Sequence, residues 1–165
     1  MIPPMTYVWK DGALRPLGRF HNRAADAFTE GEYYTIEVFE ERSWRSHKHY
    51  FATIHDLWLN LPESAAMEPW AASSEHLRKY ALIRTGWHDS TTFPVTSAAE
   101  AQRTATVVRA LTPADDYTIA VARGDLVEVF RAKSQSMRGM GKDDFQQSKD
   151  DVLGFIGKIL QGNAA

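Results

Sequence analysis

Two kinds of hydrophobic spacing alternate along the chain and predict a mixture of strands and helices. Apolar and polar positions alternate in residues 5–9, and Lys10, Asp11 and Gly12 then form a turn signal before residues 13–17. This pattern predicts a β-hairpin with its second strand at a sheet edge, because Pro16 cannot donate a ladder hydrogen bond. Residues 19–28 predict a short helix, and the alternation in residues 34–39 predicts a third strand.

Helical spacing dominates the middle of the chain. Apolar positions from Trp44 to Leu61 recur every three or four residues and predict a helix that ends before Pro62. A second helix is expected to begin with Ser74 as its N-cap and to end near Gly86. Its inward-facing residues are expected to be Leu77, Tyr80 and Ala81.

The C-terminal half repeats this alternation of element types. Ser97 and Glu100 form a capping box that opens a helix ending before Pro113, with a short extended piece at residues 93–95 before it. This helix carries Ala101, Val107, Val108 and Leu111. Residues 117–121 and 126–130 flank a turn and predict a second hairpin.

A basic segment rich in Ser and Gly, residues 133–142, connects this hairpin to a terminal helix. We expect the connector to be flexible, and Asp143 and Gln146 to be the cap pair of the helix. The periodic positions of that helix are Phe145, Lys149, Val152, Ile156, Ile159 and Leu160. Together these elements predict a single α+β domain over residues 1–165.

The composition is that of a globular chain, with 165 residues of which 44% are hydrophobic and 24% charged. The absence of cysteine excludes a disulfide scaffold and a thiolate metal site. The first residues lack a signal-peptide pattern, and no run approaches the roughly 20 apolar residues that span a bilayer. We therefore expect a cytoplasmic protein with no membrane partner.

Catalytic chemistry finds little support. The chain has no Gly-x-Ser-x-Gly elbow and no Walker or Rossmann phosphate loop. Its densest histidine group, His47, His49 and His55, lacks the His-Glu-x-x-His spacing, and His47 lies on an apolar stripe where a buried structural role is expected. Four further side chains could join this group in three dimensions: Asp56, His76, His88 and Asp89. A metal-dependent nuclease thus stays a third alternative, while we favour a non-enzymatic protein without a cofactor.

Basic and aromatic residues occur together in three segments: residues 42–51, 78–88 and 131–142. Their cationic groups can pair with phosphates, and exposed rings can stack on unpaired bases. A net charge of -2 excludes a uniformly basic nucleic-acid binder but is compatible with a local basic patch. Charged helix faces around a buried aromatic stripe would have the same composition, so each segment alone also has a purely structural interpretation.

Three blocks, residues 42–51, 75–89 and 133–153, resemble in order and local pattern an uncharacterised family of phage proteins. With the N-terminal hairpin, the resemblance covers most of the chain. That family is in turn similar to the NinB (Orf) proteins of lambdoid phages, which are recombination mediators that bind single-stranded DNA. The resemblance implies a non-catalytic DNA-binding role and is compatible with a homodimer.

The sequence therefore predicts a phage or prophage accessory protein that binds single-stranded or branched DNA in recombination or replication. The residues expected to contact DNA are Arg45, Lys48, Arg78, Trp87, Lys133, Arg138 and Lys142. The alternative is a protein-binding module that engages a host recombination, replication or defence protein, since Trp, Tyr and Arg are favoured at interface hot spots.

Overall fold

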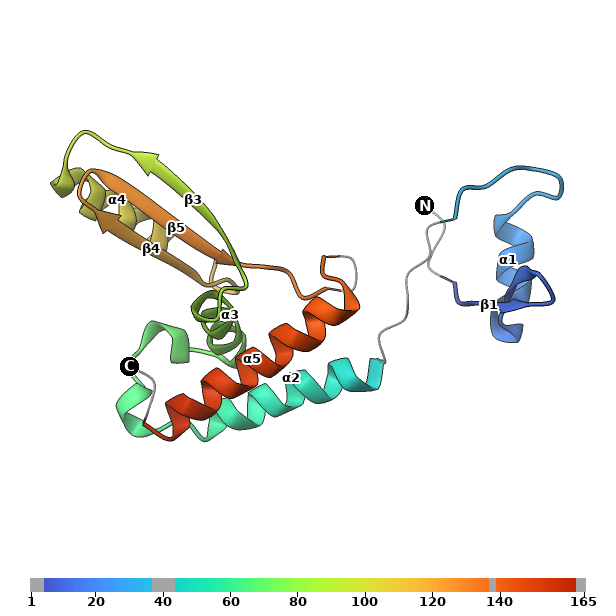
Figure 1. The fold of residues 1–165 in the computed structure, drawn as a ribbon, viewed down its shortest axis with the longest axis horizontal. Coiled ribbons are helices and arrows are strands. Elements are labelled where there is room, and N and C mark those ends of the chain that lie inside the picture. Colours follow the sequence, from blue (N-terminus) through green and yellow to red (C-terminus); the bar gives the residue numbers. More distant parts are fainter. Residues whose placement is uncertain (1–4, 37–43, 137–138, 163–165) are drawn as a thin grey trace. The chain divides into compact units, whose positions relative to one another are not determined.

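The computed structural model describes residues 5–36, 44–136 and 139–162. For Trp44 and Arg45 it describes the backbone but not the side chain. Backbone contacts divide the chain into two compact units, Met1–Val38 (unit 1) and Phe39–Ala165 (unit 2). The described residues form five α-helices and two small sheets (Figure 1). The predicted α+β class is confirmed, whereas the assignment of the whole chain to one domain stays a prediction.

Unit 1 contains the predicted hairpin and short helix. Strand β1 (Tyr7–Lys10) pairs antiparallel with β2 (Ala13–Pro16). Asp11 and Gly12 between them have positive φ angles of 54° and 74°, as a type I′ turn requires, and the twist of such a turn matches that of its strands. A short 3-10 turn, η1 (Gly18–Phe20), leads directly into α1 (His21–Ala27).

The predicted third strand is wrong for residues 34–36, which pair with no strand. The Tyr34 ring instead meets the Phe28 ring edge-on, with 4.8 Å between the centroids. Its hydroxyl accepts a hydrogen bond from the backbone N–H of Thr29. These contacts fold the segment back toward the end of α1. Residues 37–39 of the predicted strand lie outside the described residues.

Unit 2 has a helical layer made of α2 (Trp44–Leu59), α3 (Ser74–Arg84) and α5 (Lys142–Leu160) (Figure 1). All three helices were predicted, and α2 ends before Pro62 as expected. Their shared core includes Tyr50, Ile54, Leu77, Leu82, Val152 and Ile156. Two short 3-10 turns, η2 (Glu63–Ala65) and η3 (Pro69–Ala71), connect α2 to α3. No helix within the described ranges is both long and apolar enough to cross a membrane.

A three-stranded antiparallel sheet forms the other layer of unit 2, in the order β3-β5-β4. Its strands are β3 (His88–Pro94), β4 (Thr118–Arg123) and β5 (Leu126–Ala132). Helix α4 (Ala98–Leu111) covers one face through small side chains, since Ala101 and Ala105 pack on Ala120, Val127 and Val129. The β4–β5 hairpin was predicted. Strand β3 is longer than the piece predicted at residues 93–95. The prediction missed the first five residues of the strand because they are polar and show no apolar alternation.

The start of α4 confirms one half of the predicted capping box. The Oγ of Ser97 accepts the N–H of Glu100 at 3.2 Å. Glu100 returns its carboxylate to the N–H of Thr96 at 2.8 Å instead of to Ser97. Two of the apolar residues predicted on this helix, Val107 and Leu111, are exposed, because the narrow alanine stripe is the face that meets the sheet.

Two other cap predictions are wrong. Helix α3 is capped by Ser73, whose Oγ accepts the N–H of His76, and not by the following Ser74. Helix α5 begins after Gly141 without a side-chain cap. Gln146, expected in a cap pair, donates instead to the carboxylate of Asp150 one turn further on.

Candidate nucleic-acid interface

A buried polar network fastens the connector to the helical layer. Because α5 already begins at Lys142, the last residue of the predicted connector, the name is kept from here on for residues 133–141. The Oε1 of the buried Gln135 accepts hydrogen bonds from the Tyr50 hydroxyl (3.2 Å) and from Nη1 of Arg78 (2.6 Å). The Nε2 of the same amide donates to Oγ of Ser148, which is fully buried on α5 (2.8 Å). Because buried polar groups are costly unless paired, these bonds favour one position of the connector.

The described part of the connector is also folded into a tight turn. The Oγ of Ser136 accepts the N–H of Gly139 at 3.0 Å and is itself bonded to Oγ of Ser134 at 3.1 Å. A Cβ at Gly139 would lie 3.0 Å from the side chains of both serines. These contacts define one conformation of the described residues, and the expected flexibility of the connector stays a prediction. The glycine permits a close approach, and the hydroxyls bond within the turn.

Three segments meet at one end of unit 2, which we call the connector end: the first two turns of α2, the connector and the first turn of α5 (Figure 1). His47 stacks on Phe145 with 5.3 Å between the ring centroids, and Tyr50 meets the Phe145 ring edge-on at 5.8 Å. His47, expected to be buried, is partly exposed but has the structural packing role that its position predicted.

Three of the seven residues expected to contact DNA have described side chains on the segments of the connector end. Lys48 on α2, Lys133 at the start of the connector and Lys142 at the start of α5 are all exposed there. The backbone N–H of Lys133 donates to the carbonyl of Trp87, which fixes the first residue of the connector. Arg138 and the side chain of Arg45 lie outside what the structure describes.

The charge at the connector end has contributions of both signs. Helices α2 and α5 both begin there, and the first N–H groups of a helix carry partial positive charge that attracts anions. Asp143 and Asp144, in the first turn of α5, are exposed and repel anions. The balance between these carboxylates and the three lysines therefore controls how strongly this surface attracts phosphate.

Arg78 does not belong to this surface, which corrects the DNA-contact role predicted for it. Its guanidinium is buried, donates to both carboxylate oxygens of Glu75 and lies 5.3 Å from the centroid of the Phe51 ring. Burial raises the pKa of Glu75, but the hydrogen bond and the charge of Arg78 outweigh it and lower that pKa below its ordinary value. Turning Arg78 toward a phosphate would break these bonds and the one to Gln135, so its role is structural.

Trp87, the expected stacking residue, is half-buried against the helical core. Its Nε1 donates to Oδ2 of Asp151 on α5 at 2.9 Å. Its backbone N–H bonds to the carbonyl of Leu82, which helps to close the end of α3. These contacts engage Trp87 in joining α3 to α5.

The structure also forms an aromatic and basic group that the sequence did not reveal. Trp70, Tyr80 and Tyr117 lie together, with Arg84 and Arg109 among the side chains that line the same hollow. The sequence placed Tyr80 in the core and grouped Arg84 with Trp87. No local pattern joins these residues, because η3, α3, α4 and the segment before β4 meet only in the folded chain.

No three His, Asp or Glu side chains come close enough to hold a metal ion among the residues for which the structure gives positions. No model of a known protein family, no curated protein and no solved structure matches the chain. The resemblance to the NinB proteins therefore stays a prediction.

Proposed function

We propose that this protein binds single-stranded DNA at the connector end of unit 2 and does not catalyse a reaction on it. The observation that carries the proposal is that three exposed lysines, Lys48, Lys133 and Lys142, belong to three segments that the contacts of Gln135 and Phe145 join. Lysine ammonium groups and helix N-termini both bind phosphate oxygens. The resemblance to the NinB proteins supports a phage or prophage accessory role in recombination or replication, in the cytoplasm.

The hydrogen bonds of the connector support this function. Hydrogen bonds hold Gln135 and Gly139, two of the described residues of the connector, before any ligand arrives. A loop that is already ordered loses less conformational entropy on binding than a loose one. Lys133, whose backbone N–H is fixed to the carbonyl of Trp87, can therefore meet a strand at low entropic cost.

The proposal leads to a specific salt dependence. Simultaneous substitution Lys48→Ala, Lys133→Ala and Lys142→Ala is expected to weaken binding to a single-stranded oligonucleotide. It should also reduce the slope of log affinity against log salt by about 2, since each single-strand phosphate contact contributes about 0.7. Fluorescence anisotropy at several NaCl concentrations measures both quantities, and thermal melts check that the variant folds.

Lys158→Ala is the matched control. Lys158 is exposed on the same helix as Lys142 and lies about 24 Å away along its axis, at 1.5 Å per residue. Its removal changes the net charge by one unit but should leave the salt slope as it is. Equal slopes for the parent and the triple variant would refute the proposed interface. Gel shifts with duplex and forked DNA, with and without Mg²⁺, identify the preferred form and would reveal cleavage by a nuclease.

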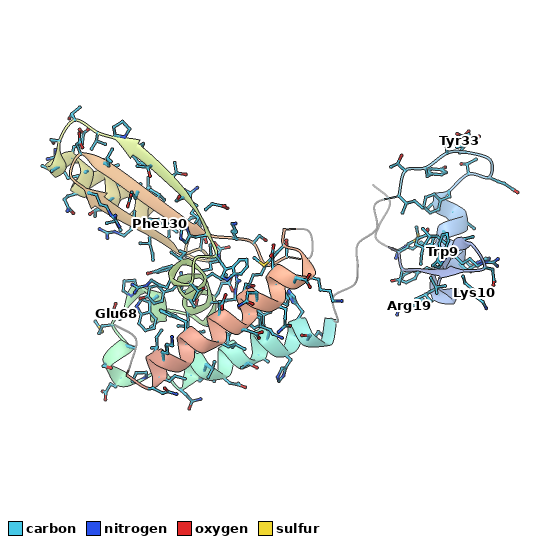
Figure 2. All side chains as sticks on the ribbon, viewed as in Figure 1. Trp9, Lys10, Arg19, Tyr33, Glu68 and Phe130 are labelled. Atoms are coloured by element: carbon cyan, nitrogen blue, oxygen red, sulfur yellow. The ribbon has the colours of Figure 1, made fainter. Side chains whose placement is uncertain are left out.

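A second candidate function is protein binding through unit 1. Trp9 is 69% exposed and Tyr33 fully exposed on this unit (Figure 2), and Ala24 is its one buried residue among those described. A partner that covered these rings would supply apolar contacts that the unit lacks. Trp9→Ala should then abolish retention of a host protein by the immobilised chain, whereas substitution of the exposed Met67 on unit 2 should not. Sedimentation of the chain alone tests the homodimer that the resemblance allows.

A further inference from the structure

Two adjoining hollows on unit 2, which we call together the aromatic groove, have volumes of about 640 and 660 Å³. Glu68, Trp70, Tyr80 and Arg84 line both, and Arg109 and Tyr117 also line the larger one. Volumes of this size are typical of sites for small molecules. The lysines of the connector end do not line either hollow.

The rings of the aromatic groove are held in place by the fold. Trp70 and Tyr80 stack face to face, with 5.0 Å between their centroids and 7° between their planes. Tyr117 meets the Tyr80 ring edge-on at 5.9 Å. The Nε1 of Trp58 donates to the carbonyl of Ala71 at 2.7 Å and so ties η3, which carries Trp70, to α2. Tyr80 covers one face of the Trp70 ring, and the other face would meet a flat ligand in an orientation that the fold has already set.

Two guanidinium groups lie beside these rings. Arg84 is exposed on α3, with its Cζ 5.8 Å from the centroid of the Tyr80 ring, and Arg109 is exposed near the end of α4. Burial raises the pKa of the Tyr117 hydroxyl to about 12, the charges of Tyr80 and Glu68 raise it as well, and those of Arg109 and Arg84 lower it. All these groups thus lie within electrostatic reach of one hydroxyl, which stays protonated at neutral pH and can donate a hydrogen bond.

The carboxylates that line the groove do not cancel the positive charge of its two guanidinium groups, so the groove can attract an anion. Asp116 accepts a hydrogen bond from Nζ of Lys79 at 2.8 Å, and the ammonium charge of Lys79 offsets the charge of this carboxylate. Glu68 is exposed at the edge of the helical layer (Figure 2) and offsets one of the two guanidinium charges. The groove therefore combines a stacking surface with an excess of positive charge.

We propose that the aromatic groove binds a nucleotide, that is, a flat aromatic base joined to an anionic phosphate. The base lies against the Trp70–Tyr80 pair, because stacking accepts the face of any base. The phosphate pairs with Arg84 and Arg109, since guanidinium groups match phosphate oxygens in a bidentate geometry. The same chemistry would recognise a free mononucleotide or one nucleotide of a single strand. This site goes beyond the proposed function and shares no residue with the connector end.

Calorimetric titration of the full chain with dTMP, thymidine and inorganic phosphate tests the proposal. We expect dTMP to bind at least about tenfold more tightly than thymidine or phosphate, because thymidine cannot pair with the guanidinium groups and phosphate cannot stack on the rings. Equal affinity for all three, or no binding of dTMP at millimolar concentration, would overturn it.

Variants locate the site. The double substitution Arg84→Ala and Arg109→Ala should weaken dTMP binding about tenfold or more, and Trp70→Leu should do the same by removing the stacking ring. Glu68→Gln should strengthen binding, because it removes a negative charge from the groove. Arg103→Ala is the matched control, since Arg103 is exposed on the same helix as Arg109 and does not line the groove. Thermal melts confirm that each variant folds, and unchanged dTMP affinity in the folded double-arginine variant would refute the site.

Two further experiments are needed. One distinguishes a free mononucleotide from a nucleotide within a strand, and the other distinguishes the aromatic groove from the connector end. Competition of oligothymidylate against dTMP in the parent chain indicates a nucleotide within a strand, and its failure indicates a free mononucleotide. The triple-lysine variant should keep the dTMP affinity of the parent even if it loses DNA. Loss of dTMP binding in that variant, with the groove variants unaffected, would assign the nucleotide to the connector end and overturn the proposal.

Discussion

At the scale of single residues, Ser148 is the clearest departure from hydrophobic periodicity. It is fully buried on α5, at a position where helical spacing favours an apolar side chain. Its hydroxyl accepts a hydrogen bond from Nε2 of Gln135 and donates to the carbonyl of Phe145. The Oε1 of Gln135 in turn accepts hydrogen bonds from the side chains of Tyr50 and Arg78. The core between α2, α3 and α5 is therefore specified by hydrogen bonds as well as by apolar packing.

The Tyr50 hydroxyl in this network leads to a prediction about alkaline stability. Burial raises the pKa of Tyr50 to about 12, whereas tyrosine in an unfolded chain titrates near 10. Between these pH values the folded chain retains a proton that the unfolded chain has lost, so the free energy of unfolding falls as pH rises. While Tyr50 alone titrates, the loss is about 1.4 kcal/mol per pH unit.

Urea denaturation at several pH values from 8.5 to about 11.5 measures this loss. Tyr50→Phe has no hydroxyl to ionise, so its stability should decline less steeply with pH than that of the parent. Some decline should remain in the variant, because burial also raises the pKa of Tyr117 to about 12. Parallel curves for the two chains would show that Tyr50 ionises in the folded chain as easily as in the unfolded one.

At the scale of elements, the end of α3 shows how a local backbone motif turns the chain from the helical layer to the sheet. The N–H of Gly86 bonds to the carbonyl of Ile83, and the N–H of Trp87 bonds to that of Leu82, which is the Schellman pattern. Gly86 has a φ of 90°, a value that L side chains rarely adopt. Strand β3 begins two residues later, so this glycine directs the chain from one layer into the other.

Two glycine substitutions should therefore change stability in opposite directions. Gly86→Ala is expected to destabilise by about 1 kcal/mol or more, because alanine is strained at this φ. Gly154→Ala, on the exposed face of α5 with no atom near the added Cβ, should stabilise by about 0.5–1 kcal/mol. Urea midpoints of both variants check the pair. A stabilising Gly86→Ala would contradict the motif at the end of α3.

At the scale of the whole molecule, the two units differ in how much core they have. Both clusters of buried apolar residues that the structure describes belong to unit 2. Unit 1 relies on a hairpin and a short helix, and assemblies of fewer than about 40 residues rarely fold without a staple or a partner. We therefore expect unit 2 to account for the cooperative unfolding of the chain.

Truncation tests this expectation and the single-domain prediction together. A chain of residues 39–165 should unfold at nearly the same urea concentration as the full chain, since its two clusters are intact. Residues 1–38 alone should show little helix or strand by circular dichroism. A large drop in the midpoint of the longer fragment would instead show that the units share a core and form one domain.

The candidate sites could be predicted only in part. Lys48, Lys133 and Lys142 were named from basic and aromatic composition, but the joining of the segments that carry them depends on how α2 packs against α5. Arg78 lies in a segment of similar basic and aromatic composition, but its side chain is buried and donates hydrogen bonds to Glu75 and Gln135. Composition cannot separate these cases, because the burial of a long cationic side chain depends on the elements packed around it.

The elements with local signals could be derived from the sequence: both hairpins, all five helices and the Ser97 cap, since such signals depend on residues a few positions apart. Strand β3 was largely missed, because its polar residues carry no alternation and it pairs with the distant β5. The buried network, the connector end and the aromatic groove required the tertiary structure. Each joins segments through long-range packing, and hydrophobic periodicity shows which face of an element is buried but not which element covers it.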